Sequence, residues 1–199
     1  LVDVGTGVRV TEGLTDLRTM TIPLNRVQAL EVIQPVWWRP LGWWRVRVNV
    51  AGVGSSGSGD GEGERETTLL PVGTLADALR VLTLLAPRVS AWQWNDAVLG
   101  EGPQPGWQTS SARAKLFDTL SWRRNGWSDT EGAVLLRSGR LTRRAIAVPH
   151  ARIQSLTLQQ GWLQASRGVA TLHVIPAPGP ISPVLDHLDT EAAHDAFAR

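Results

Sequence analysis

Arginine and tryptophan are the residues of this sequence whose types and spacing could support chemistry. The segment RSGRLTRR contains four arginines in eight positions: Arg137, Arg140, Arg143 and Arg144. A guanidinium group donates paired hydrogen bonds to phosphate or carboxylate oxygens, so such a cluster could hold an anionic group. The alternative is a basic hairpin face that only solvent covers.

Four tryptophans within eight residues form the second group: Trp37, Trp38, Trp43 and Trp44, with Arg39 among them. One small core cannot easily bury four indole rings, and tryptophan favours membrane interfaces and the centres of protein interfaces. We therefore expect Trp37, Trp38, Arg39 and Trp43, like the arginine cluster, to contact a lipid surface or a partner. A contact between two domains and a half-buried sheet edge are the alternatives.

The sequence offers no catalytic or metal-binding constellation. There is no cysteine, which excludes thiol catalysis, disulfides and zinc–thiolate sites. The four histidines share no ligand spacing beyond His187 and His194, seven residues apart, for which a solvated helix is the simpler interpretation. The glycine-rich GSGDGEG lacks the Lys-Ser/Thr of a phosphate-binding loop. We expect no enzyme, no cofactor and no metal; a soluble enzyme is the less favoured alternative.

Composition narrows the class of protein further. The chain has 199 residues, 42% of them hydrophobic, and a net charge of only +2. This charge is too small to create the strong positive field that is typical of proteins that bind nucleic acid. Lys115 is the only lysine among 20 basic residues. No apolar run approaches the roughly 20 residues of a membrane-spanning helix. The chain begins at Leu1 with a strand-like segment, which suggests a fragment of a longer protein.

An internal repeat organises the chain. The segment Thr21–Val48 recurs as Ala147–Val174 at one constant offset, since 149 − 23, 152 − 26 and 168 − 42 all equal 126. The identical pairs are Pro23/Pro149, Arg26/Arg152, Gln28/Gln154, Gln34/Gln160 and Gly42/Gly168. An ungapped match of this length predicts two copies of one domain. Two interpretations remain for the repeated pairs Arg26-x-Gln28 and Arg152-x-Gln154: contact with a ligand or partner, or a structural role. The repeat does not distinguish them, because both kinds of role would repeat.

Alternating apolar and polar residues predict antiparallel strands and one amphipathic helix in each copy. The strands expected in the first copy are Val8–Val10, Leu14–Ile22, Val27–Ile33, Trp43–Val50 and Thr67–Leu70, followed by a helix over Leu75–Leu85. Thr74 is a suitable N-cap for that helix. Pro35–Leu41 predicts a short helical turn or bulged crossover that Gly42 ends. Residues 52–66 are polar and glycine-rich, which predicts a flexible loop.

The second copy repeats this order. Its expected strands are Ala133–Arg137, Arg140–Val148, Arg152–Gln159 and Val169–Ile175, with a crossover over Gly161–Ser166 and a closing helix capped by Asp189. We expect domains over residues 1–87 and 126–199, joined by a linker over 88–125 with a short helix at Ser110–Leu120. The strand alternation places Leu30, Val32, Leu156 and Leu158 in the cores.

The repeat also carries a family resemblance. The pattern V/I-P-x-x-R-I/V-Q-x-L, followed by a glutamine, a glycine and an alternating strand, resembles the bacterial pleckstrin-homology-like (PH-like) domain of the second class. Such domains occur in tandem in YdbS/YdbT-like membrane proteins. The resemblance implies a mainly β (α+β) fold: two tandem PH-like domains, each a bent antiparallel sheet or partial barrel closed by a C-terminal helix.

The resemblance implies no catalytic residues. It implies a non-enzymatic binding or scaffolding module on the cytoplasmic face of the cell membrane, within a membrane-anchored parent protein. The expected partner is a membrane surface or a membrane protein, with homo-oligomers possible and no nucleic acid. A domain pair that serves only protein–protein assembly is the alternative.

Overall fold

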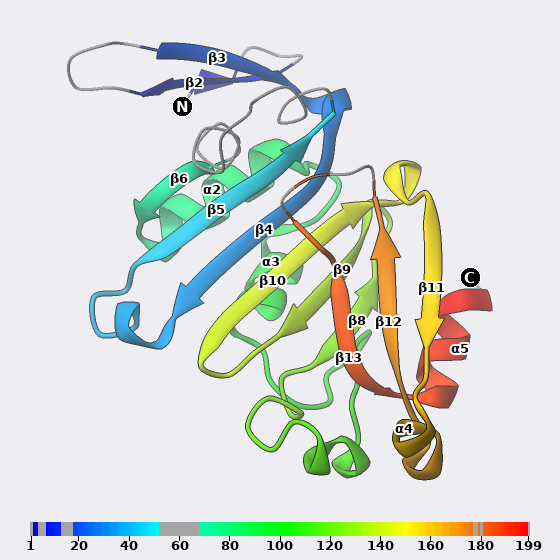
Figure 1. Ribbon diagram of the computed structural model, residues 1–199. Coiled ribbons are helices and arrows are strands. Elements are labelled where there is room, and N and C mark those ends of the chain that lie inside the picture. The colour runs from blue at the N-terminus through cyan, green and yellow to red at the C-terminus, as the bar shows by residue number, and fades with distance from the viewer. Residues whose placement is uncertain are drawn as a thin grey trace, which may run out of the picture.

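The computed structural model describes residues 2–3, 7–12, 18–51, 68–176, 179 and 181–198 (Figure 1). The described chain is built mainly from antiparallel strands with a few helices, which confirms the predicted fold class. The predicted loop over residues 52–66 and the first predicted hairpin turn, at residues 13–17, lie outside the described residues.

The first repeat copy runs from β1 to α2. Its strands are β1 (Val2–Asp3), β2 (Gly7–Glu12), β3 (Arg18–Pro23), β4 (Val27–Pro35), β5 (Trp44–Val50) and β6 (Thr68–Gly73). Its helical segments are the 3-10 turns η1 (Leu24–Arg26) and η2 (Val36–Trp38) and the helix α2 (Leu75–Leu85). The predicted cap is confirmed, because Asp77 N donates to Thr74 Oγ1 over 3.3 Å and Thr74 N donates to Asp77 Oδ2 over 3.0 Å.

The connection contains a helix that the sequence did not predict, α3 (Ala91–Leu99), which Ser90 caps in the same way. After it come β7 (Gln108–Thr109) and the 3-10 helix η3 (Ala112–Leu116), the only helical part of the predicted Ser110–Leu120 segment. The second copy then contains β8 (Gly126–Asp129), β9 (Ala133–Ser138), β10 (Thr142–Pro149), η4 (His150–Arg152), β11 (Ser155–Gln159), α4 (Trp162–Arg167), β12 (Val169–Ile175), β13 (Val184–Asp189) and α5 (Thr190–Ala198).

Strand pairing follows the repeat residue by residue. In the first copy Val8 pairs with Ile22 and Leu30 with Val48. In the second copy the positions 126 further on make the same pairs, Val134 with Val148 and Leu156 with Val174. The two copies therefore fold with one common register, as a tandem repeat requires.

The two copies share one sheet. Strand β4 of the first copy pairs antiparallel with β10 of the second, which joins seven strands in the order β6-β5-β4-β10-β9-β8-β7. In this register Leu30 lies opposite Ala147 and Pro35 lies opposite Thr142. The strands β1-β2-β3 and β11-β12-β13 form two separate sheets, at opposite ends of the central one in Figure 1.

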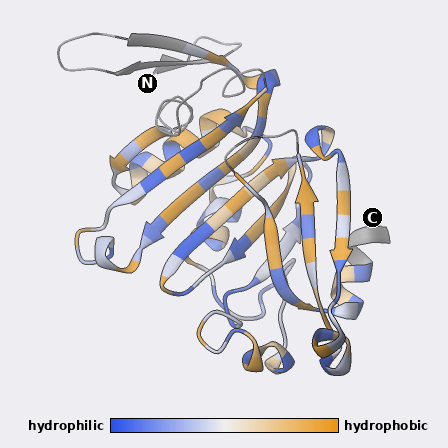
Figure 2. Cartoon of the chain, viewed as in Figure 1, coloured by the Kyte–Doolittle hydropathy of each residue, from blue (hydrophilic) through white to orange (hydrophobic). Residues whose placement is uncertain are grey.

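Each face of the central sheet contributes to a different core, because successive residues of a strand point to opposite sides. Leu135 and Ala147 pack into the first core with Leu30 and Val32, under α2 and α3. Leu136 and Val148 pack into the second core with residues of β12 and β13. The strands of the central sheet accordingly show both apolar and polar bands in Figure 2.

The predicted core positions differ between the copies. Leu30 and Val32 are fully buried, as predicted. Leu156 and Leu158 are only half buried, although they pack against the second core. The difference arises from strand position: β4 lies inside the seven-stranded sheet, whereas β11 is an edge strand.

Candidate functional site

The predicted arginine and tryptophan groups meet at one edge of the central sheet. The β4–β10 pairing ends where Pro35 lies opposite Thr142. The segment that follows Pro35 and the turn that precedes Thr142 therefore leave the sheet together (Figure 1). We call residues 36–43 and 139–142 the tip.

Hydrogen bonds hold the first-copy part of the tip in a defined shape. Gly42 adopts a φ of 65°, in the left-handed region that glycine reaches without strain. Gln34 Nε2 donates to Trp43 O over 3.3 Å, and Trp43 N donates to Trp38 O over 3.1 Å. The loop is thus closed by its own backbone and does not depend on a partner for its shape.

The second copy builds its crossover in the same way. Gly168 has the same φ of 65°, and Gln160 Nε2 donates to Val169 O over 2.9 Å. Val169 is the residue 126 positions after Trp43. These shared contacts show why a glutamine and a glycine recur at fixed spacing: they close the crossover.

The tip exposes large apolar side chains. Trp37 is 69% exposed, Leu41 57% and, on the turn of the second copy, Leu141 60%. Trp43 is 40% exposed and meets Trp38 edge to face, with ring centroids 6.2 Å apart. Arg45 lies over the Trp38 ring at 5.1 Å. Only Trp44 of the four tryptophans enters the core.

Three guanidinium groups accompany these apolar side chains. Arg39 Nη2 donates to Arg140 O, while its buried Nε has no hydrogen-bond partner among the described residues. Arg143 Nη1 donates to Gln34 Oε1 over 3.5 Å. Burial, followed by the like charge of Arg143, lowers the pKa of Arg39. No carboxylate of the described residues forms an ion pair with any of the three, so positive charge accumulates here.

The structure places Arg137 elsewhere, and its predicted place in an exposed arginine cluster is wrong. Its side chain is fully buried and donates to Gly102 O, to Gln104 Oε1 and to Asp96 O. The guanidinium lies 4.2 Å from the centroid of the Trp107 ring. Burial lowers the pKa of Arg137 to about 10. Alternation along β9 turns this residue to the face that the connection covers.

Arg144 is on the surface but is already paired. Its Nε lies 2.9 Å from Glu31 Oε1 of the first copy, and Arg47 Nη1 lies 3.7 Å from Glu31 Oε2. Glu31 is almost completely buried, and burial raises its pKa although both arginines lower it. Arg144 therefore helps to join the copies and is less available to a ligand than Arg140 or Arg143.

Sequence reasoning missed Arg124, a second buried arginine. Its guanidinium donates to Val98 O over 2.6 Å, to Gly100 O over 2.9 Å and to Ala97 O over 3.2 Å. These carbonyls end α3, where a positive charge is favourable. Burial lowers the pKa of Arg124 to about 10. Its role depends on α3, so only a prediction of that helix could have indicated it.

The repeated Arg and Gln signature is not used alike in the two copies. Arg152 donates to Asn25 O of the first copy, whereas Arg26 is exposed. Gln28 is buried and Gln154 is exposed. The structure thus gives Arg152 a contact between the copies, and no shared ligand position emerges from the four residues.

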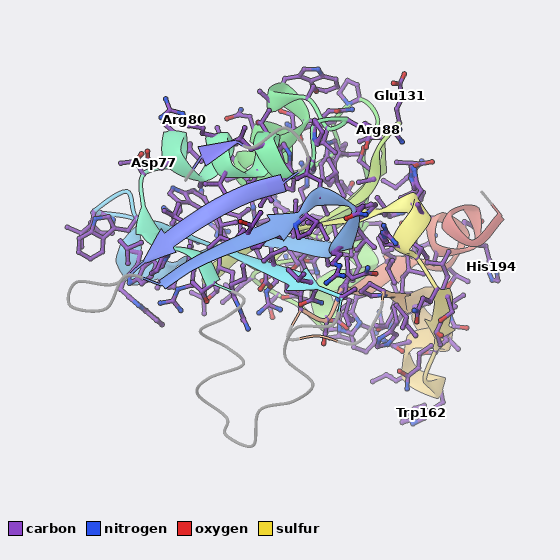
Figure 3. The ribbon with its side chains drawn as sticks, turned by 90° about the horizontal axis from the view of Figure 1, so that it is seen from above. Asp77, Arg80, Arg88, Glu131, Trp162 and His194 are labelled. Atoms are coloured by element: carbon purple, nitrogen blue, oxygen red, sulfur yellow. The ribbon has the colours of Figure 1, made fainter. Side chains whose placement is uncertain are left out.

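The second-copy crossover also exposes apolar residues. Trp162 is 83% exposed and Leu163 is 42% exposed, at the start of α4. They correspond to Val36 and Trp37 at the offset of 126. Figure 1 places α4 at the lower right, apart from the β9–β10 turn at the lower left, and Figure 3 shows Trp162 at the outside of the molecule.

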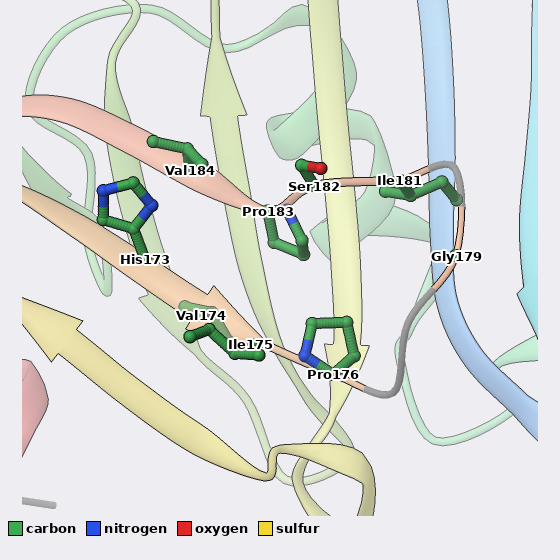
Figure 4. A pocket seen from close by; sticks show the side chains of 9 residues that line it. All are labelled: His173, Val174, Ile175, Pro176, Gly179, Ile181, Ser182, Pro183 and Val184. Atoms are coloured by element: carbon green, nitrogen blue, oxygen red, sulfur yellow. The ribbon is translucent and has the colours of Figure 1, made fainter.

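Other features of the described residues offer less chemistry. A hollow of about 230 Å³ lies between the end of β12 and the start of β13, and His173 and Ser182 are the polar side chains among the described residues that line it (Figure 4). His187 stacks on Phe117 with ring centroids 4.9 Å apart. Within the described part of the chain no three acidic, histidine or cysteine residues are grouped as metal ligands. No described helix is both long and apolar enough to cross a membrane.

Comparison with known proteins agrees with the repeat. A family model described as a bacterial PH domain matches residues 4–89 and again residues 109–197. No curated protein and no solved structure matches the chain. The two matches together cover more than half of the chain and coincide with the two sets of strands in common register. The chain belongs to the bacterial PH-domain family and carries two tandem copies of the domain.

Proposed function

We propose that this tandem PH chain is a non-catalytic module that docks on an anionic membrane surface through the tip. One observation carries the proposal: Arg39, Arg140 and Arg143 converge beside exposed Trp37 and Leu141, and none of the three forms an ion pair with a carboxylate of the described residues. Arginine attracts anionic headgroups, and tryptophan sits at the level of those headgroups. A membrane surface offers both environments side by side.

We propose the cytoplasmic face of the cell membrane as the setting, because the cytoplasmic leaflet carries anionic lipids. Attachment to a membrane-anchored parent protein is part of the same proposal. The exposed Trp162 and Leu163 of the second copy offer a second apolar contact. Two contacts on one molecule raise its apparent affinity beyond that of either alone when both reach the surface at once.

Sedimentation with liposomes tests the proposal. A triple variant, Arg39→Gln, Arg140→Gln and Arg143→Gln, removes three charges, each worth about 1 kcal/mol near an anionic surface. Binding to phosphatidylserine-containing vesicles at low salt should weaken about a hundredfold. Raising the salt concentration should also weaken the binding of the wild type, because salt screens exposed charges.

A control uses Arg80→Gln with Arg88→Gln, two exposed arginines outside the tip that Figure 3 labels. This variant loses charge but keeps the tip, and it should bind nearly as the wild type does. Wild-type protein that ignores anionic vesicles at low salt would refute membrane docking. The exposed tryptophans would then mark a protein interface, with a membrane protein or a second copy of this chain as partner.

A further inference from the structure

The two end sheets repeat the two halves of the central sheet. In the central sheet, β6-β5-β4 of the first copy meets β10-β9-β8 of the second. Strands β1-β2-β3 match β8-β9-β10 in register: Val2 pairs with Arg9, and the positions 126 further on make the same pair between β8 and β9. Strands β11-β12 match β4-β5 in the same way. Each end sheet is therefore one half of an arrangement that the central sheet shows complete.

The edge strands β3 and β11 are the equivalents of two strands that pair with each other. Among the described strands, β3 pairs only with β2, and β11 pairs only with β12. Their equivalents at the offset of 126 are β10 and β4, which join the two copies. Figure 1 shows the two end sheets at opposite ends of the central one, so β3 and β11 do not meet within one molecule. Each molecule thus presents two complementary edges that point to different neighbours.

Burial along β11 shows the effect of the absent neighbour. In β4, which has a strand on each side, Glu31 and Val32 are both buried. At the equivalent positions of β11, Thr157 is exposed and Leu158 is only half buried. A strand added to this edge would cover the half-buried leucines of β11 and pair with its free backbone groups, as β10 does for β4.

The edge of β11 also lacks the features that usually keep an edge strand from pairing, which are charged residues, proline, bulges and short length. Strand β11 has five residues, SLTLQ, in unbroken register with β12. Other edge strands of the described sheets have such features. Strand β6 contains Pro71, β7 has only two residues, and β13 contains Asp186 and Asp189. By this comparison β11 is suited to accept a further strand.

We propose that β11 of one molecule pairs antiparallel with β3 of a second copy of this chain, in the register of the β4–β10 pairing. Leu30 pairs with Ala147 in that register, and 30 + 126 = 156 and 147 − 126 = 21, so Leu156 of one molecule lies opposite Thr21 of the other. The next pairs are Thr157 with Met20, Leu158 with Thr19 and Gln159 with Arg18. The contact is head to tail, so the assembly closes into a ring or extends as a filament.

Sedimentation velocity of the full chain over a range of concentrations tests the association. Wild-type protein should form oligomers whose share rises with concentration. Thr157→Lys should weaken association at least about tenfold, because pairing would cover the ammonium group, as β10 covers Glu31, opposite an uncharged residue. Thr157 is exposed, so this variant should fold normally. Gln108→Lys adds the same charge to an exposed position of the two-residue strand β7 and should associate as the wild type does.

Cysteine cross-linking tests the register, because the chain contains no cysteine of its own. A mixture of Thr21→Cys and Leu156→Cys molecules should form disulfide-linked dimers on mild oxidation, since residues directly opposite each other have Cβ atoms about 5 Å apart. A mixture of Thr21→Cys and Leu158→Cys molecules, with the same exchange two residues out of register, should form clearly fewer.

Three results would overturn the proposal. The first is wild-type protein that stays monomeric up to millimolar concentration. The second is a Thr157→Lys variant that associates as the wild type does. The third is a Leu158→Cys variant that links to Thr21→Cys as well as Leu156→Cys does, because the two chains would then not meet in the register of the internal pairing.

Discussion

The Asn49 side chain of the first copy forms two hydrogen bonds with the backbone of Ile181 in the second. Asn49 Nδ2 donates to Ile181 O over 3.1 Å, and Ile181 N donates to Asn49 Oδ1 over 3.0 Å. The amide thus imitates one residue of a neighbouring strand. A Cβ at Gly179 would come within 2.5 Å of Asn49 Cγ, so glycine is needed for this close approach.

Asn49→Ala should destabilise the protein by about 2–4 kcal/mol, because it leaves a buried N–H and a buried C=O of Ile181 without partners. Denaturant unfolding followed by far-ultraviolet circular dichroism measures the change. The exposed Gln108→Ala is a suitable control and should change stability by less than about 0.5 kcal/mol. An Asn49→Ala variant as stable as the control would show that water replaces the amide.

Arg137→Met should destabilise the fold by about 2–4 kcal/mol, since the bonds from its guanidinium to Gly102, Gln104 and Asp96 are charge-assisted and buried. Arg140→Met, the same exchange at an exposed position of the turn that follows β9, should change stability by less than about 0.5 kcal/mol. Chemical denaturation compares the two variants. Equal effects would contradict the buried placement of Arg137.

Leu30 and Leu156 provide a matched pair at the same repeat position. Leu30→Ala should cost about 2–5 kcal/mol, because the side chain is completely buried and its removal leaves a cavity. Leu156→Ala should cost clearly less, because this side chain is half buried on an edge strand. Urea unfolding of both variants gives the order, and a larger loss for Leu156→Ala would contradict the shared-sheet arrangement.

Glu31 predicts a pH dependence of stability. Burial raises its native pKa above the ordinary value of 4.5, so the native state holds this proton more tightly than the unfolded state does. The resulting stabilisation is complete below that value and is lost as the pH rises through the native pKa. Glu31→Gln does not titrate. The stability of the wild type minus that of Glu31→Gln should therefore fall as the pH rises above the ordinary value of 4.5.

Urea unfolding at several pH values measures this difference, and the subtraction cancels the titration of all other groups. A difference that rises with pH would mean that the ion pairs to Arg144 and Arg47 outweigh burial.

The repeat made part of this structure predictable. The constant offset anticipated a common register, and Gly42 and Gly168 recur because both crossovers need a left-handed residue. The alternation placed Leu30 and Val32 in the core correctly. Local patterns of this kind report which residues share a face, and that information is present in the sequence.

The rest depends on how the copies meet. The alternation of apolar and polar residues in β4 and β10 does not indicate that these two strands pair with each other. The seven-stranded sheet was therefore not predicted. The burial of Arg137 has the same origin, since its acceptors lie 33 to 41 residues away in the connection. The meeting of Arg39 with Arg140 likewise follows from the β4–β10 pairing and not from either segment alone.

The β4–β10 pairing also bears on any attempt to isolate one half of the molecule. Without the other copy, each half would expose the edge of a long strand whose backbone N–H and C=O groups have no hydrogen-bond partners. Such strands recruit one another, which leads to swapped dimers or precipitation. We therefore expect the two copies to be stable only together, because each copy covers the strand edge through which the other would self-associate.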